Sequence, residues 1–222
     1  MLESYYTVKP EGSEEVTIQK SRFIGYVKRC ETEEEAQDFI SQIKKKHHDA
    51  THNCSAYMIG EHDLIQKAND DGEPSGTAGV PILEVLKKRG LKDTAVVVTR
   101  YFGGIKLGAG GLIRAYGSTA SEAINATGVV KRQLMKEMKI TIDYHLLGKV
   151  ENGVRNSVYT LEGINYLENV ELIVYVESGL EKEFEDWMTN LTSGQASMEQ
   201  GDASYVEFDV TLSKGAYGYE AP

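Results

Sequence analysis

The sequence predicts an α+β protein made of two domains. Its 222 residues exceed the usual size of a single domain, which is about 100–150 residues. The charge balance also changes near Gln133: the first 133 residues hold 18 Lys+Arg and 18 Asp+Glu, net 0, whereas the remainder holds 6 and 16, net −10. The order of predicted strands and helices restarts at the same place. We therefore expect domains at 1–133 and 134–222.

The first domain is expected to begin with strands and a capped helix. Residues 7–10 and 14–30 are rich in β-branched and aromatic side chains, which is typical of strands. Thr32 and Glu35 have the spacing of a capping box and place a helix start at Thr32. The apolar stripe expected to face the core is Ala36, Phe39, Ile40 and Ile43.

Basic and histidine residues crowd the end of this helix. The run 44–48 is either a solvated helix end or an edge that contacts phosphate. His47, His48, His52 and Cys54 lie within eight residues, but their spacing fits no ordinary zinc pattern. A loop leading into a strand at 54–59 is the favoured interpretation, and no metal site is predicted.

Ten of the 22 glycines fall between Asp70 and Ala126. This stretch reads as an acidic turn, a helix at about 77–89, a strand at 94–99, a glycine loop at 103–111 and another helix. The apolar residues at 95–98 do not alternate with polar ones, which indicates a strand buried on both faces. A strand that leads through a glycine loop into a helix start presents free N–H groups to an anion.

The candidate site for an anion or nucleic acid lies where this strand ends. It comprises Arg100, Tyr101, Gly103, Gly104, Lys106, Gly108, Gly110, Gly111 and Arg114, with His52, Asp70, Asp71, Glu73 and Ser75 in support. The three acidic residues could hold Mg²⁺, or they could cap the following helix and pair with Arg100 or Lys106, which we favour. The glycines could equally serve a tight loop and close helix packing.

The second domain repeats the strand and helix pattern. After a linker and strand entry at 128–138, we expect strands at 139–144, 164–167, 171–176 and 205–212 and helices at 146–160 and 180–191. This β-α-β-β-α-β order is the ferredoxin-like plan. Residues 214–222 are expected to be a frayed end.

Three segments carry a resemblance to a known family. The segments NDDGEPSGTAGVPILEVL and VVVTRYFGGIKLGAGGLIRAYG resemble the signature of the Impact family, whose bacterial members are the YigZ-like proteins, and HNCSAYMIG fits as well. The resemblance implies a first domain similar to the second domain of ribosomal protein S5, a ferredoxin-like second domain and a role in translation. Eukaryotic members restrain a translation-control kinase by competing for its activator, which favours a protein-interaction role as the alternative.

The favoured function is a translation-associated protein that binds RNA or the ribosome through the glycine-rich edge. An enzyme acting on a phosphorylated small molecule is the least favoured hypothesis, because Ser75 and Cys54 are nucleophiles by type alone and no catalytic residue or cofactor is predicted. The acidic second domain repels phosphate, which favours either a protein partner there or a role of this charge in solubility alone. With no long apolar run and only two cysteines, the chain is expected to be cytoplasmic, without a membrane partner.

Overall fold

The computed structural model describes residues 1–212 and 219–220 and divides into two compact units. The N-terminal unit comprises Tyr5–Lys131 with Phe208–Pro222, and the C-terminal unit comprises Arg132–Glu207 with Met1–Ser4. The predicted α+β architecture of two domains is confirmed. Each unit also takes in one end of the chain, which a single cut after Gln133 does not describe. Independent folding of 1–133 and 134–222 stays a prediction.

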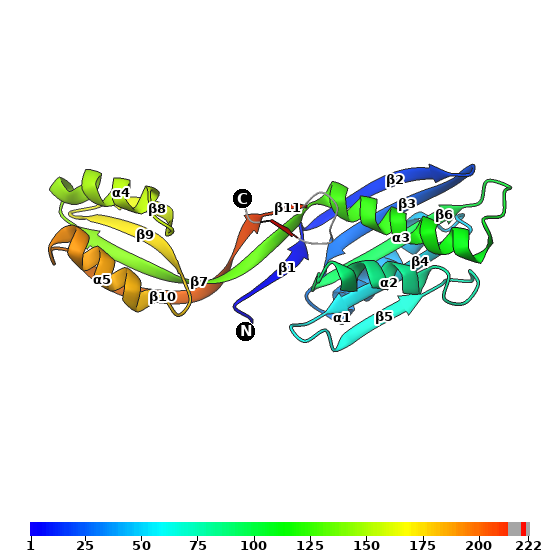
Figure 1. Cartoon of the computed structure of the whole chain (residues 1–222), viewed down its shortest axis with the longest axis horizontal. Coiled ribbons are helices and arrows are strands. Elements are labelled where there is room, and N and C mark those ends of the chain that lie inside the picture. Colours follow the sequence, from blue (N-terminus) through cyan, green and yellow to red (C-terminus); the bar gives the residue numbers. More distant parts are fainter. Residues whose placement is uncertain (213–218, 221–222) are drawn as a thin grey trace. The chain divides into compact units, whose positions relative to one another are not determined.

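The N-terminal unit is built on a five-stranded antiparallel sheet (Figure 1). Its strands are β2 (Glu11–Ile18), β3 (Ser21–Arg29), β6 (Thr94–Tyr101), β4 (His52–Ile59) and β5 (Ile65–Asn69), in that spatial order. β6 lies in the centre and pairs with β3 and β4, so that β5 is an outer strand.

Helices cover both faces of this sheet. α1 (Glu33–Lys46) packs on one face, and α2 (Gly79–Lys88) and α3 (Gly108–Thr127) pack side by side on the other. β6 shows why its apolar residues do not alternate with polar ones: Ala95 and Val97 enter the α1 core, while Val96 and Val98 enter the core below α2 and α3. The predicted burial of this strand on both faces is confirmed.

The predicted start of α1 is also confirmed. The Thr32 hydroxyl oxygen accepts a hydrogen bond from the Glu35 backbone N–H at 3.2 Å. The Glu35 carboxylate accepts from the Glu31 N–H at 2.8 Å, one residue earlier than in a standard capping box. Three glutamates occupy the first turn and complement the positive end of the helix dipole.

The C-terminal unit has the predicted ferredoxin-like order. β7 (Val129–Ile142), β8 (Thr160–Tyr166), β9 (Val170–Glu177) and β10 (Ser197–Asp209) adopt the spatial order β10-β7-β9-β8. The helices are α4 (Leu147–Arg155), which follows the short 3₁₀ helix η1 (Tyr144–Leu146), and α5 (Glu181–Thr192). β9 alternates buried and half-buried residues, as a strand with one buried face should.

Of the linker and strand entry predicted at 128–138, the strand entry is confirmed, because β7 runs without a break from Val129, and the two units divide within this strand, between Lys131 and Arg132. Val129 and Val130 are buried, so both supply apolar anchors where a linker was expected. β1 (Ser4–Val8) also pairs with β7. The frayed end expected at 214–222 lies outside the described residues except for β12 (Tyr219–Glu220), which pairs with β11 (Thr211–Leu212). None of the helices within the described ranges is both long enough and apolar enough to cross a membrane.

Candidate functional site

A cavity of about 400 Å³ opens where β6 ends and α3 begins. Its walls come from the start of β4, the acidic turn before α2, the end of β6, the glycine loop and the first turn of α3. Five predicted site residues line it: His52, Glu73, Arg100, Lys106 and Gly108. The other lining residues are Thr51, Pro74, Phe102, Leu107, Ala109 and Leu112.

Arg100 is a buried structural cation within this cavity. Its side chain is only 6% exposed, and Nη1 donates to Glu73 Oε1 at 2.7 Å. The Tyr116 hydroxyl donates to the same oxygen at 2.8 Å. The favoured pairing of the acidic turn with Arg100 is therefore present through Glu73. Arg100 Nε has no hydrogen-bond partner among the described residues.

Tyr101 points away from Arg100, because successive residues of a strand face opposite sides of the sheet. Its hydroxyl lies 2.8 Å from His47 Nδ1 and donates to Asp49 Oδ1 at 3.1 Å. His47 is buried, and its Nε2 lies 2.6 Å from the Tyr26 hydroxyl. Burial, together with nearby Lys46, lowers the pKa of His47, which favours the neutral ring. The structure thus separates Tyr101 from the rest of the predicted cluster.

His52 turns one ring nitrogen toward the cavity. Its Nδ1 lies 2.8 Å from the Asp71 carbonyl oxygen, which can only accept, so Nδ1 carries the proton of that bond. Nε2 lies 3.7 Å from Glu73 Oε2. The backbone of the acidic turn therefore fixes the ring, and Glu73 is shared by Arg100, Tyr116 and His52.

The aspartates of the acidic turn are occupied by donors from the protein. Asp70 accepts three backbone N–H bonds, from Gly76, Ala78 and Gly79, at 2.8–3.0 Å, and so caps the start of α2. Burial raises the pKa of Asp70, but the three donors outweigh it and hold that pKa below its ordinary value. This outcome matches the favoured capping interpretation.

Asp71 is held by α1 and β4 instead of by α3. Its Oδ1 accepts from Lys44 Nζ at 2.6 Å, and its Oδ2 accepts from the Asn53 N–H at 2.7 Å. The pKa of Asp71 is lowered, since Lys44 and the Asn53 amide outweigh the cost of its burial. Ser75 lies exposed in the same loop. Among the described residues, no group of three or more His, Cys, Asp or Glu side chains is arranged to hold a metal ion.

Three glycines of the loop are required by the fold: Gly103 by a close backbone approach, and Gly104 (φ +86) and Gly108 by their positive φ angles. A Cβ on Gly103 would lie 1.9 Å from the Lys20 carbonyl oxygen, so the loop passes directly against the turn between β2 and β3. Gly108 has φ +69 at the start of α3, which disfavours any other residue. Gly104 is exposed, and Gly110 and Gly111 lie inside the first turn of α3, because the helix begins at Gly108 and not after Gly111.

The start of α3 is open and flanked by cations. No side chain caps it, and no acidic residue lies in its first turn. Lys106 and Arg114 are exposed and form no ion pair within the described part of the chain. A Cβ built on Gly110 would lie 3.9 Å from Arg114 Nη1, so this guanidinium reaches back to the helix start. An anion placed here would meet backbone N–H groups and two exposed cations.

Sequence reasoning missed two residues that shape the cavity. Phe102 is 46% exposed, and its ring lies 5.4 Å from the Arg100 guanidinium carbon. The second is Tyr116 of α3, which holds the cavity wall by donating to Glu73. An aromatic residue two positions after Arg100 in the sequence was the available signal for Phe102. No sequence signal connects Tyr116 with Glu73.

The cysteine near the cavity is not set up as a nucleophile. Burial raises the pKa of Cys54 to about 12, so the thiol stays protonated at neutral pH. The thiol donates to the Asp70 carbonyl oxygen at 3.0 Å.

Comparisons with known proteins agree with the described fold. The profile of the Impact N-terminal domain matches residues 19–124, and that of a domain of unknown function, DUF1949, matches residues 140–195. The chain is 61% identical over 207 residues to IMPACT family member YvyE of Bacillus subtilis, covering 93% of this chain and 95% of that protein.

Two further relatives extend this picture. IMPACT family member YigZ of Escherichia coli is 37% identical over 151 residues, which cover 64% of this chain and 74% of that protein. A crystal structure described as that of a hypothetical protein is similar at 30% identity with a TM-score of 0.58, covering 89% of this chain and 97% of the other.

Proposed function

The chain belongs to the Impact family, and we propose that it is a translation-associated protein whose N-terminal unit binds RNA, free or in the ribosome. The observation that carries this proposal is the open start of α3 beside two unpaired cations, Lys106 and Arg114. RNA phosphates are bound by such N–H groups and by Lys and Arg side chains.

The aromatic side of the cavity favours single-stranded RNA. Phe102 is exposed and lines the cavity together with Lys106. An RNA base can stack on an exposed aromatic ring, and this stacking depends little on which base it is. Arg100 is not assigned a direct phosphate contact, because Glu73 already neutralises it. Its role is to hold the wall against which the loop and α3 are placed.

The properties of the site support a binding protein over an enzyme. Cys54 stays a thiol, and the carboxylates of Asp70, Asp71 and Glu73 accept hydrogen bonds from protein donors. A phosphoryl-transfer enzyme of the P-loop or kinase type uses carboxylates to hold Mg²⁺ against its substrate.

The test is a salt series of RNA binding by the full chain. Single-stranded RNA with a fluorescent label is titrated with wild type, Lys106→Ala, Arg114→Ala and the double variant. Each lost phosphate contact should weaken binding and reduce the slope of log K against log salt by about 0.7. Lys87→Ala is the matched control, because Lys87 lies in the last turn of α2, away from the proposed site. This end of α2 packs near the C-terminal end of α3, as the hydrogen bond from Arg89 to Asn125 shows. Unchanged binding by the double variant would rule out this site.

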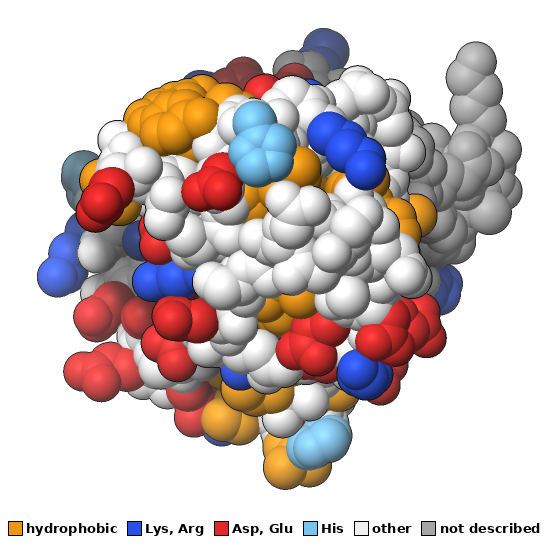
Figure 2. Space-filling view, turned by 90° about the vertical axis from the view of Figure 1, so that its left-hand side faces the viewer, with side chains coloured by type: hydrophobic (Ala, Val, Ile, Leu, Met, Phe, Trp, Pro, Cys, Tyr) orange, Lys and Arg blue, Asp and Glu red, His pale blue; other side chains and the backbone are white. Residues whose placement is uncertain are grey.

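The C-terminal unit is a second candidate for contacts, with a protein partner. Tyr144, Tyr166 and Leu167 are 52%, 62% and 66% exposed, and the Tyr144 hydroxyl donates to the Leu167 carbonyl oxygen, so that these apolar groups lie together. Acidic side chains are spread over much of the face of this unit seen in Figure 2. We propose that a basic protein surface docks here. Loss of a cross-linked partner in Tyr166→Ser but not in the exposed control Lys149→Ser would support it, and equal cross-linking would contradict it.

A further inference from the structure

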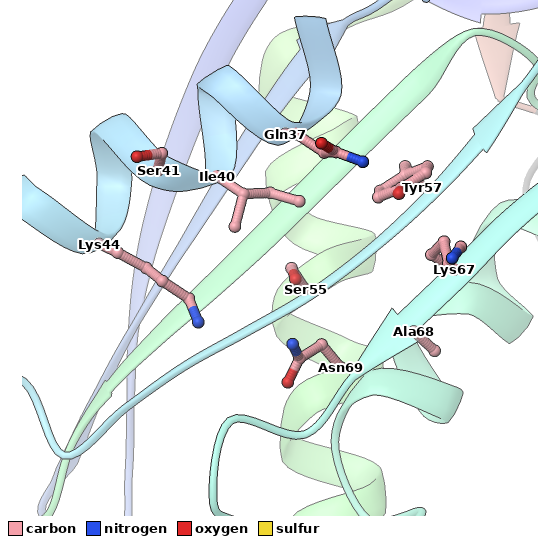
Figure 3. A pocket seen from close by; sticks show the side chains of 9 residues that line it. All are labelled: Gln37, Ile40, Ser41, Lys44, Ser55, Tyr57, Lys67, Ala68 and Asn69. Atoms are coloured by element: carbon pink, nitrogen blue, oxygen red, sulfur yellow. The ribbon is translucent and has the colours of Figure 1, made fainter. Parts of the chain in front are cut away.

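A second cavity of about 360 Å³ lies on the α1 face of the N-terminal sheet (Figure 3). α1 packs on β4 and β6, while β5 is the outer strand. The space between α1 and β5 therefore remains open. Nothing in the RNA-binding proposal uses this cavity.

Two regular stripes of side chains form its walls. Four residues of α1 spaced as one helical stripe make the first wall: Gln37, Ile40, Ser41 and Lys44. The second wall comes from two cross-strand pairs of β4 and β5 that share one face of the sheet, Ser55 with Asn69 and Tyr57 with Lys67. Both walls are thus set by secondary structure and not by a loop.

The lining carries two lysines and no carboxylate. Lys44 uses one of its three N–H donors on Asp71, at 2.6 Å, which holds the ammonium group beside the cavity. Lys67 is exposed and has no ion-pair partner among residues 1–212 and 219–220. Asp71 offsets one positive charge, and the other remains available to a ligand.

Polar groups without partners face the same space. Ser55 is only 3% exposed, yet its hydroxyl forms no hydrogen bond within the described residues. The Asn69 Oδ1 accepts from the Asp71 N–H at 2.8 Å, which leaves the side-chain NH₂ free to donate. Figure 3 shows the polar ends of Lys44, Ser55 and Asn69 turned toward one another. Because the Ser55 hydroxyl oxygen is not fully buried, a ligand or water in the cavity can reach it and satisfy it.

We propose that this cavity binds a small organic anion whose phosphate or carboxylate group is held by Lys44, Ser55, Asn69 and Lys67. The side chain of Ile40 and the Tyr57 ring offer the carbon part of the ligand an apolar surface. The volume falls within the range of small-molecule sites, about 300–1,000 Å³.

The test is an amide NMR titration of the full chain with two probes, glycerol 3-phosphate and succinate, which distinguish the phosphate from the carboxylate. Saturable shifts are expected at the amides of Ser55, Lys67 and Asn69 with at least one probe. Lys67→Gln and Asn69→Asp should each weaken that binding about tenfold or more, since each removes a charge-assisted or neutral donor to the anion. Asn69→Asp keeps the acceptor for the Asp71 N–H while placing a negative charge in the cavity.

Matched controls separate this site from the start of α3. Lys45→Gln removes the same charge as Lys67→Gln, but at an exposed position of α1 that does not line the cavity, and it should leave the binding unchanged. Lys106→Gln should change the shifts that the probes induce only at the start of α3, at Gly108 and Gly110. The proposal is overturned if neither probe gives saturable shifts at the cavity, or if Lys45→Gln weakens binding as much as Lys67→Gln does.

Discussion

α2 and α3 lie side by side on one face of the sheet, yet their N-termini are treated in opposite ways. α2 begins with the Asp70 carboxylate accepting three backbone N–H bonds. α3 begins with no side-chain cap, no acidic residue in its first turn and two exposed cations nearby. The carboxylate at α2 is an internal anion in the position that stays open at α3. The difference supports the proposal that the start of α3 receives an anion from outside the chain.

The comparison assumes that Arg100 pairs with Glu73 and is not available to a ligand. Removing Arg100 should therefore cause the largest loss of unfolding free energy among the variants proposed here. Arg100→Met leaves the Glu73 carboxylate buried with Tyr116 and without its guanidinium partner. Breaking a buried pair from one side costs about 3–5 kcal/mol of unfolding free energy. Urea denaturation measures it, and adding Glu73→Gln to Arg100→Met should recover part of the loss. A loss below 1 kcal/mol would mean that Arg100 is free to serve a ligand.

Removing the Asp70 carboxylate at the start of α2 should cause the next largest loss of unfolding free energy. Asp70→Ala removes the acceptor for three backbone N–H groups and should cost about 1.5–3 kcal/mol, compared with about 1 kcal/mol for the single cap lost in Thr32→Ala at α1. Chemical denaturation of both variants tests this ranking. Equal losses would show that the three bonds of Asp70 act no more strongly than one ordinary cap.

The dependence of unfolding free energy on acid pH tests the same Asp70 carboxylate. The pKa of Asp70 in the folded protein lies below its ordinary value of 3.8, so between those two values the unfolded chain binds more protons than the folded chain. The contribution of Asp70 is therefore fully present above about pH 4 and is lost as the pH falls through the lowered pKa. Wild type should lose more unfolding free energy than Asp70→Ala between pH 5 and pH 2. Parallel curves would contradict the assignment.

Replacing Gly108 or Gly110 by Ala at the start of α3 should change the stability of the protein in opposite directions. Gly108→Ala forces a side chain onto φ +69 and should cost about 1–2 kcal/mol. Gly110 lies in the helix, and a Cβ there would meet only the end of the Arg114 side chain, at 3.9 Å, so Gly110→Ala should stabilise by up to about 1 kcal/mol. Thermal unfolding of both variants tests the distinction. Destabilisation by Gly110→Ala would mean that this glycine also serves the fold.

The order of strands and helices could be predicted because local patterns determine it. The Thr32 cap, the non-alternating residues 95–98 and the β-α-β-β-α-β order each depend on neighbouring residues and are confirmed. The site was harder to predict. Arg100 and Tyr101 are adjacent in sequence, and the alternation of the strand alone would have placed them on opposite faces. The bonds of Glu73 to Arg100 and Tyr116 join residues 27 and 43 positions apart, which only the packed sheet brings together.

The smallest expected change in stability gives the sharpest test of the comparison. Ala109→Asp places a carboxylate in the exposed first turn of α3. At α2 the corresponding carboxylate is that of Asp70, which precedes the helix in the sequence. It should stabilise the protein by about 0.3–1 kcal/mol through the helix dipole. The same charge should oppose RNA phosphate, so RNA affinity should fall while stability rises. Ala126→Asp is the matched control, since it adds the same charge at an exposed position in the last turn of α3. That variant should be slightly destabilised and should keep its RNA affinity. If Ala109→Asp gains stability and binds RNA as wild type does, the open start of α3 is not the RNA site, and the difference between the two helices is one of folding alone.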